Sequence, residues 1–356
     1  MDLNPYNFVR FGEPGIKESV LRHDRFHEKE NSGRLTCQLL TLTHLFVPET
    51  QDRLDRRQHQ KLQVLRGSGP LLPGSSIKGV VRSVAEALSG SCMVLPSRFS
   101  YPTKTREYLT YELPEVFKNC QSVERACPAC RIFGLLGKGE KNIHTGKISL
   151  EDAHVVNEAE LEWLTITALM EPKPRHRPWY GDPAKPSQVR GRKFYFHRPQ
   201  EPQRTATKNE FNKTIEAVKP GALFKFTLDY ANLTDDELAL LVFALALEEP
   251  MRHKFGMGKP VGLGSTEVTI NGWEKHDRLA RYKTFGSGTT MVESSAVNSE
   301  VETWRQNYHR IYSRWRSSFE DLRRIWTWNP ASTIKVKYPT QQWFKDNPNA
   351  PLEKAP

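Results

Sequence analysis

The order of apolar segments along the chain constrains its fold more than any other feature of the sequence. Alternating and Thr/Val/Leu-rich segments predict strands, and apolar residues at helical spacing predict helices. A turn at Pro73 and Gly74 precedes the first helix, and a capping box of Thr234 and Glu237 precedes the second. In chain order we expect a strand at 35–47, a helix at 75–90, strands at 147–156 and 222–229, a helix at 238–247 and a strand at 266–270.

Strand, helix, strand, followed by strand, helix, strand, is the order of a ferredoxin-like fold. We therefore predict an α+β chain with a ferredoxin-like core, two long insertions and a basic, partly helical C-terminal extension. In that extension, residues 300–326 are expected to form a basic helix with an aromatic face that either packs or stacks. The expected boundaries are a first core part at 1–91 with a long loop at 48–70, an insertion at 92–145, a core strand at 146–157, an insertion at 158–217, a second core part at 218–270 and the extension at 271–356.

The charge balance points to a polyanionic partner. The 356 residues contain 52 Lys and Arg against 41 Asp and Glu, which gives a formal net charge of +11. The longest apolar run, residues 238–247, is half of the roughly 20 residues that a membrane helix needs. The N-terminus carries polar and aromatic residues where a signal peptide would be apolar. We expect a cytoplasmic protein with no membrane contact.

The cysteines favour a metal site over disulfides. Five cysteines are an odd and sparse number for a disulfide framework, and Cys120, Cys127 and Cys130 lie close together in sequence. A structural zinc needs four ligands, and Cys92 is the best fourth candidate, with His144 as the alternative. The competing interpretation is a set of buried free thiols. A zinc ion here would stabilise an irregular insertion and would not take part in catalysis.

The first helix begins with the sequence PGSSIKGVVR. Ser75 or Ser76 can cap it, and the unpaired N–H groups of a helix N-terminus suit a phosphate. Lys78 and Arg82 lie one turn apart on the face opposite the Val residues, where both can reach one phosphate backbone. The alternative is an amphipathic helix with a solvated basic face.

Two further segments suit nucleic acid. Residues 253–265 hold four glycines between a helix and a strand, which allows close approach of a phosphate or of another chain segment. In the segment 190–197, Arg192 and Lys193 alternate with aromatic residues, as in proteins that bind single-stranded nucleic acid. The alternative for the second segment is a strand with an aromatic face and a solvated basic face.

Together these motifs resemble the RAMP superfamily of CRISPR-associated proteins, and most closely the backbone subunits of type III effector complexes. The resemblance covers about residues 5–270 and is carried, in order along the chain, by residues 73–79 with Arg82, then 127–134, 191–195 and 262–265. It implies an RRM-like core, a thumb-like insertion at 158–217, and guide RNA, target RNA and other effector subunits as partners. The guide contacts that it implies are Ser75, Ser76, Lys78 and Arg82, supported by His253, Lys254 and Lys259.

The resemblance also implies a catalytic aspartate in the loop at 48–70. In such subunits a loop aspartate acts with Mg²⁺ or another divalent cation while the 2′-hydroxyl of the target RNA attacks the adjacent phosphate. Asp55 is the expected residue and Asp52 the alternative. Because Arg53, Arg56 and Arg57 surround it, Asp55 is equally suited to a plain ion pair. Two other functions remain open, namely a scaffold subunit without catalysis and an endoribonuclease that processes precursor RNA.

Overall fold

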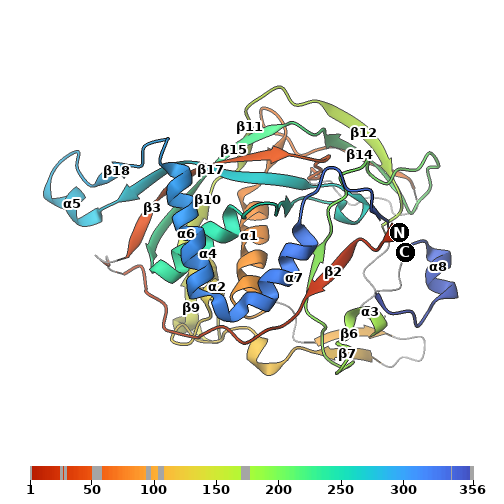
Figure 1. Cartoon of the computed structure of the whole chain (residues 1–356), viewed down its shortest axis with the longest axis horizontal. Coiled ribbons are helices and arrows are strands. Elements are labelled where there is room, and N and C mark those ends of the chain that lie inside the picture. The colour runs from red at the N-terminus through yellow and green to blue at the C-terminus, as the bar shows by residue number, and fades with distance from the viewer. Residues whose placement is uncertain are drawn as a thin grey trace.

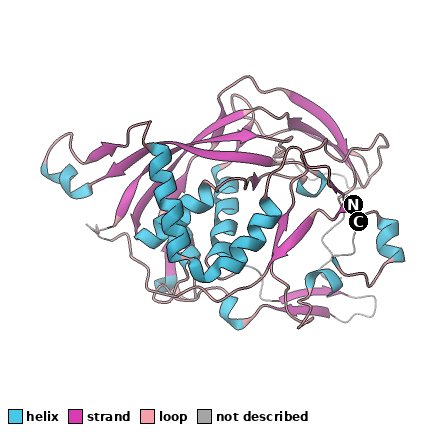
Figure 2. Cartoon of the chain, in the orientation of Figure 1, coloured by secondary structure: helices cyan, strands magenta, loops and turns pink. Residues whose placement is uncertain are grey.

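A computed structural model gives the fold of the chain. It describes residues 2–24, 27, 30–49, 58–93, 98–102, 108–169, 177–337 and 339–352. The mixed α+β class predicted from the sequence is confirmed, because α-helices and β-strands both occur along the described chain (Figures 1 and 2).

One eight-stranded sheet organises the molecule. Its strand order is β16-β17-β3-β15-β11-β5, with β10 also paired to β15 and β18 paired to β17, and all of these pairs are antiparallel. The strands are β3 (Asn31–Thr41), β5 (Leu71–Leu72), β10 (Ile148–Leu150), β11 (Ala153–Val155), β15 (Leu223–Leu233), β16 (His253–Lys254), β17 (Ser265–His276) and β18 (Thr289–Met291). The four strands expected for the core are, in chain order, β3, the pair β10 and β11, β15 and β17. In the sheet they lie in the order β17, β3, β15, β11, which is fourth, first, third, second.

Four helices lie together on one side of this sheet (Figure 1). They are α1 (Gly74–Leu88), α4 (Asp235–Leu245), α6 (Val297–Ile311) and α7 (Arg316–Trp326). The capping box expected before α4 is present, since Thr234 and Glu237 exchange side-chain and backbone hydrogen bonds. The helices and the sheet enclose one apolar core.

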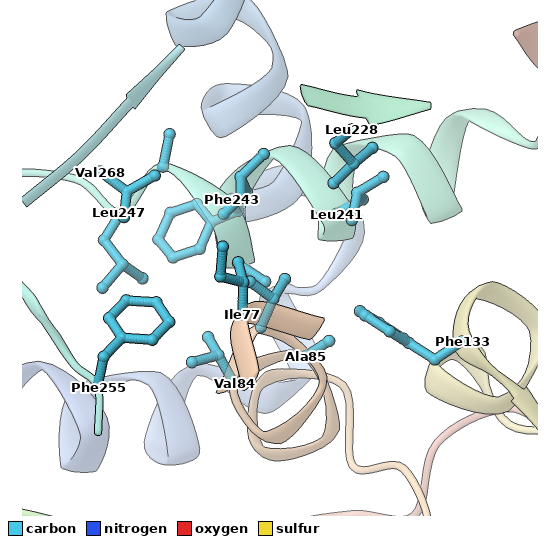
Figure 3. Packing of buried hydrophobic residues seen from close by; sticks show 14 of the residues in the cluster. Ile77, Val84, Ala85, Phe133, Leu228, Leu241, Phe243, Leu247, Phe255 and Val268 are labelled. Atoms are coloured by element: carbon cyan, nitrogen blue, oxygen red, sulfur yellow. The ribbon is translucent and has the colours of Figure 1, made fainter. Parts of the chain in front are cut away.

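Figure 3 shows how that core is filled. Ile77 and Val84 from α1 meet Leu241 and Phe243 from α4, with Val268 of β17 beside them (Figure 3). All five side chains are buried. Removing a side chain of this size from water contributes about 1.5–3 kcal/mol each, so the pairing of α1 with α4 is a main source of stability.

The C-terminal extension is part of this core and is not a single basic helix. A 3₁₀ turn, η4 (Ser313–Trp315), separates α6 from α7. The ring of Tyr308 stacks on Phe243 with centroids 4.1 Å apart, and Trp315, Phe319 and Trp326 are buried. The aromatic face therefore packs against the body of the protein and does not offer stacking surfaces to a ligand.

The two insertions form smaller sheets and turns. The first contains β6 (Arg98–Pro102), β7 (Tyr108–Glu112), η1 (Glu115–Phe117), α2 (Pro128–Phe133), β8 (Gly134–Leu136), η2 (Glu140–Asn142) and β9 (Ile143–Thr145). The second contains β12 (Leu161–Ile166), α3 (Arg177–Tyr180), β13 (Arg192–Tyr195) and β14 (Lys213–Val218). β14 pairs with β12 and with β4 (Gln60–Leu62), and β13 pairs with β2 (Tyr6–Val9).

The first and the last described segments of the chain lie close together, since Tyr6 and Leu352 belong to one buried cluster. β1 (Asp2–Leu3) pairs in parallel with β19 (Lys335–Val336), and the short helix α8 (Gln341–Asp346) follows. Among the described residues no helix has the length and apolar character that crossing a membrane requires.

Candidate metal centre and nucleic-acid interface

Four buried cysteines meet where the first insertion packs on α1. The sulfurs of Cys92, Cys120, Cys127 and Cys130 all lie within 4.8 Å of one another. The Sγ atom of Cys92 is 3.5 Å from that of Cys130 and 3.7 Å from that of Cys127. A tetrahedral zinc with Zn–S bonds near 2.3 Å requires sulfur–sulfur separations of about 3.8 Å, which these distances match.

Backbone N–H groups and neighbouring thiols surround the four sulfurs. The backbone N–H of Cys127 donates to the Sγ of Cys120 at 3.3 Å, and the N–H of Cys92 donates to the Sγ of Cys127 at 3.5 Å. Hydrogen bonds from the Cys120 thiol and its neighbours hold the pKa of Cys127 well below its ordinary value, while hydrogen bonds within the same group raise the pKa of Cys92 and of Cys130. The cluster is thus consistent with a structural zinc site, as the sequence predicts, and free thiols are the weaker interpretation.

His144 is not the fourth ligand. Its Nε2 atom lies 3.0 Å from the carbonyl of Arg131, and its ring stacks on His23, so it stands outside the group of four sulfurs. The structure thus groups Cys92, and not His144, with the other three cysteines.

Arg131, the residue after the last cysteine, ties the cluster to the core. Its buried guanidinium contacts the carboxylates of Glu237 at 2.9 Å, Asp236 at 2.6 Å and Glu18 at 2.6 Å. Lys147 reaches the other oxygen of Glu237 at 2.5 Å. Because Glu237 also closes the capping box of α4, the metal cluster and α4 share one buried charge network.

The N-terminus of α1 is capped by a distant carboxylate and not by a serine. The N-cap is Pro73, which has no side-chain bond, and the N–H of Gly74 donates to Oδ1 of Asp152 at 2.8 Å. The prediction of a serine cap is wrong because Ser75 and Ser76 already lie inside the first turn. Ser75 is exposed and Ser76 half-buried, so both hydroxyls remain near solvent beside a helix end that already binds one anionic group.

Lys78 and Arg82 lie one turn apart but face different partners. The Nζ of Lys78 makes one long hydrogen bond, 3.4 Å, to the carbonyl of Ile148, and has no carboxylate partner among the described residues. Burial, and then the charge of Arg82, lower the pKa of Lys78. Arg82 instead binds Glu86 at 2.9 Å and the carbonyl of Gly134 at 3.2 Å, with a weak 3.9 Å contact to the Sγ of Cys130. Lys78 is available to a phosphate, whereas Arg82 supports the cysteine cluster.

The basic residues of the glycine-rich loop lie mostly beneath it. His253 and Lys254 form β16 and are 1% exposed. Burial lowers the pKa of His253 to about 4, and its Nε2 lies 3.0 Å from the carbonyl of Ala244. Lys254 donates to the carbonyl of Leu263 at 3.0 Å, and burial, followed by the charges of Lys259 and Arg198, lowers its pKa to about 7.

The side chains of His253 and Lys254 point into the protein, which does not favour their predicted contact with RNA. Lys259 is half-buried and donates to the carbonyl of Gly256 at 2.5 Å. It has no carboxylate partner among the described residues, and burial lowers its pKa. A phosphate would supply the negatively charged partner that the described residues do not give Lys259.

The glycines of this loop serve close packing within the chain. Gly264 has a φ of +83°, and a Cβ there would lie 1.9 Å from the carbonyl oxygen of Phe255. Gly256 has a φ of +70°, and its Cβ would lie 2.4 Å from the carbonyl oxygen of Phe46. Of the two uses expected for these glycines, approach to another chain segment is the one that the structure shows.

The basic-aromatic segment forms a strand whose charges are enclosed. Arg192 is 7% exposed and binds Glu86 at 3.2 Å, which does not favour its predicted contact with RNA. Lys193 lies 3.6 Å from the ring centroid of Tyr6 and donates to the hydroxyl of Tyr180 at 3.1 Å. Burial lowers the pKa of Lys193 to about 8. This aromatic enclosure suits a structural cation–π contact better than a contact with RNA.

The remaining cations do not form one compact site. Lys78 contacts Ile148, which pairs with Tyr230, and Tyr230 pairs with Gly33 near the start of β3. The glycine-rich loop packs beyond the other end of β3, where the N–H of Gly264 donates to His44. The eight residue steps from Gly33 to Thr41 span about 26 Å of strand. A ligand that contacts both ends must be an extended chain.

Asp52 and Asp55 lie outside the described residues, so their expected catalytic role is untested.

Comparison with known proteins places these features in a family. A family model described as the RAMP superfamily matches residues 38–267, about two thirds of the chain. The chain belongs to the RAMP superfamily. The crystal structure of Thermofilum pendens Csc2 is similar at 15% identity and a TM-score of 0.38, covering 86% of this chain and 91% of that chain. That similarity is too weak to support any argument, and no curated protein matches the chain.

The RAMP match extends from within β3 to the start of β17, so it includes α1, the four cysteines and the glycine-rich loop. Sequence reasoning missed three residues that organise these features. Asp152 caps α1, Glu86 joins Arg82 to Arg192, and Arg131 joins α2 to α4. Arg131 directly follows Cys130, and this position beside a metal ligand was the one available signal. Asp152 is 78 residues from Gly74 in sequence, and nothing in the sequence indicated that it caps α1.

Proposed function

We propose that this RAMP protein is a guide-RNA-binding backbone subunit of a type III CRISPR interference complex. The observation that carries the proposal is the family match over 38–267, which contains the turn before α1 and the four-cysteine cluster, two of the motifs by which the sequence resembles backbone subunits. Lys78 supports it, since this half-buried cation has no carboxylate partner among the described residues and follows exposed Ser75 by three residues in α1. Its partners are guide RNA, target RNA and other effector subunits, in the cytoplasm.

The proposal includes the finer fold assignment, a ferredoxin-like, RRM-like core. The antiparallel strand order β17-β3-β15-β11, with α1 and α4 as the connecting helices, supports this assignment. The insertion at 158–217 is proposed as the thumb, and the small sheet of β12, β14 and β4 gives it a frame. The cysteines are proposed to hold zinc, which keeps the first insertion folded.

The test is co-purification with RNA. The chain, expressed with a CRISPR array and its neighbouring subunits, is expected to bring down short RNA of defined length. Lys78→Ala should weaken guide binding and flatten its salt dependence, because each phosphate contact adds to the slope of log affinity against log salt. Lys138→Ala, at an exposed lysine in the first insertion, is the matched control and should change neither guide binding nor its salt dependence. An unchanged salt slope for Lys78→Ala, or the absence of RNA, would overturn the assignment.

Target cleavage is a second part of the proposal. Asp55, or Asp52 in its place, would act with Mg²⁺ or another divalent cation on guide-paired target RNA. Loss of cleavage in Asp55→Ala, with target binding retained, would support Asp55 as the catalytic residue. The same result in Asp52→Ala alone would assign the catalytic role to Asp52. Unchanged cleavage in both variants leaves a scaffold subunit.

Processing of precursor RNA is the less favoured alternative. Such enzymes use a histidine as general acid or base. His253 in the glycine-rich loop does not suit that role, because it is buried and its pKa of about 4 leaves it neutral at pH 7. Cutting of repeat-containing precursor by the isolated chain would favour this alternative.

A further inference from the structure

A short arm extends the main sheet beyond the part of the chain that matches the RAMP model. The arm, residues 277–291, leaves the end of β17, forms the helix α5 (Arg278–Lys283) and returns as β18 to pair with residues 274–276 of β17. Figure 1 shows α5 and β18 projecting at the far left, past the helices that cover the sheet. None of the residues proposed above to contact the guide lies in this arm.

The arm has a defined structure of its own. The carboxylate of Asp277 accepts a hydrogen bond from the N–H of Ala280 at 2.9 Å and so caps α5. The hydroxyl of Ser287 donates to the carbonyls of Ala280 and Thr284, each at 2.8 Å. Gly288 has a φ of +90°, and a Cβ there would lie 2.5 Å from the carbonyl of Asp277. The side chains on the arm are therefore presented by a folded element.

These side chains expose apolar surface to solvent. Of the twelve large hydrophobic residues that the structure describes as exposed, four lie in the arm: Leu279 (43%), Tyr282 (76%), Phe285 (107%) and Met291 (61%). Single exposed apolar side chains are normal on protein surfaces, whereas several of them in one short segment indicate a binding surface.

The charges beside these rings are positive. Arg281 and Lys283 flank Tyr282, are exposed, and have no carboxylate partner within the described part of the chain. The one acidic residue of the arm, Asp277, uses its carboxylate to cap α5. Two cavities, of about 590 and 420 Å³, flank the helix, and His276, Arg278 and Tyr282 line both.

We propose that the arm binds single-stranded RNA at a site separate from the guide contacts on α1 and the glycine-rich loop. Ring faces for bases and cations for phosphates are the two components that single strands need, and the arm alternates them in the sequence RLARYKTF. Aromatic residues, Met and Arg are also enriched at protein interfaces. RNA fits the arm better because its only carboxylate, that of Asp277, caps α5, which leaves a net positive surface suited to a polyanion. Bases stack on Tyr282 and Phe285, while Arg281 and Lys283 contact the phosphates.

The test uses the full-length protein and a fluorescent 20-nucleotide single-stranded RNA that carries 4-thiouridine. Irradiation is expected to crosslink the probe to residues 278–291, identified by mass spectrometry of the peptides. The variant Tyr282→Ala/Phe285→Ala should lose this crosslink and about tenfold or more of the affinity. Arg281→Gln/Lys283→Gln should weaken binding and lower the salt slope by about 1.4, since each single-strand phosphate contact contributes about 0.7.

Two controls separate this site from surface effects and from the proposed guide contacts. Phe211→Ala removes another exposed ring, and Lys138→Gln/Lys141→Gln removes two exposed lysines of the first insertion; neither should change the crosslink. Lys78→Ala should reduce total affinity and leave the arm crosslink in place. Full affinity and an unchanged crosslink pattern in both arm variants would overturn the inference without touching the guide proposal. Loss of self-association in the arm variants, with RNA binding intact, would assign the arm to a protein interface and overturn it as well.

Discussion

At the scale of single residues, burial decides what the basic side chains can do. The sequence suggests that Lys254 contacts RNA, yet its side chain lies under the glycine-rich loop and donates to the carbonyl of Leu263. No carboxylate contacts it among the described residues, so its charge is costly in the folded protein. Lys254 therefore shapes the loop, and the exposed or half-buried Lys78 and Lys259 remain as candidate phosphate contacts.

This burial predicts a pH-dependent stability. The pKa of Lys254 is 10.5 in its ordinary state and about 7 in the folded chain, so between pH 7 and 10 the unfolded state binds more protons. Stability then rises with pH across this window, by up to about 1.4 kcal/mol per unit. Urea unfolding at pH 7, 8 and 9 should show this rise for the wild type relative to Lys254→Met. Lys138→Met, at an exposed site, should follow the wild type, and equal slopes in all three proteins would contradict the assignment.

At the scale of elements, Asp152 links α1 to the strand pair beside it. Its carboxylate satisfies the first N–H of α1 and places a negative charge where a phosphate of the guide would approach. The helix end thus gains stability from a group that also competes with RNA.

Asp152→Asn is expected to separate these two effects. The amide oxygen still accepts from Gly74, so the free energy of unfolding should fall by no more than about 1 kcal/mol. RNA affinity should rise by a fewfold, because one negative charge beside Ser75 and Lys78 is gone. Glu151→Gln removes a charge from the neighbouring exposed residue and should give a smaller rise. Equal effects of the two changes on RNA affinity would mean that only net charge matters.

The sequence predicted most of the elements but little of their orientation. Hydrophobic periodicity located α1, α4 and the core strands, because the spacing of buried residues is a local property. The cysteine group was predictable because metal ligands are few in kind and regular in spacing. The face on which Arg192 lies depends on the pairing of β13 with β2, some 180 residues away, and the break between α6 and α7 depends on packing against α4. Such distant contacts have no signature in a single sequence.

At the scale of the whole molecule, the cysteine cluster and the core are expected to unfold as one unit. Arg131 joins the metal-binding helix α2 to Glu237 at the start of α4, and α4 packs on α1 and α6. Loss of the metal should loosen α2 and, through this buried network, lower the stability of the entire fold.

The protein should therefore carry about one zinc per chain, measured by atomic emission spectroscopy. Cys120→Ala should lose the zinc and melt several degrees lower in a single calorimetric transition. Cys37→Ala is the matched control, since Cys37 is a buried thiol of β3 outside the cluster, and it should keep the metal. Metal-free wild type of unchanged melting temperature would refute the site.

The distance between the two candidate phosphate contacts makes RNA length a measure of the binding path. Lys78 contacts a strand next to the start of β3, and the loop that carries Lys259 packs beyond its end. The stretch of residues 33–41 between them is about 26 Å long, a length that roughly seven to eight nucleotides of stacked single strand would span. A 12-nucleotide probe should engage both lysines, and a 4-nucleotide probe only one. For the long probe, Lys78→Ala and Lys259→Ala should each lower the salt slope by about 0.7, and the double variant by about 1.4. For the short probe, the double variant should lower the slope by no more than about 0.7. A long probe that loses no slope when Lys259 is replaced would place the RNA path away from the glycine-rich loop, and with it the proposed course of the guide across the sheet.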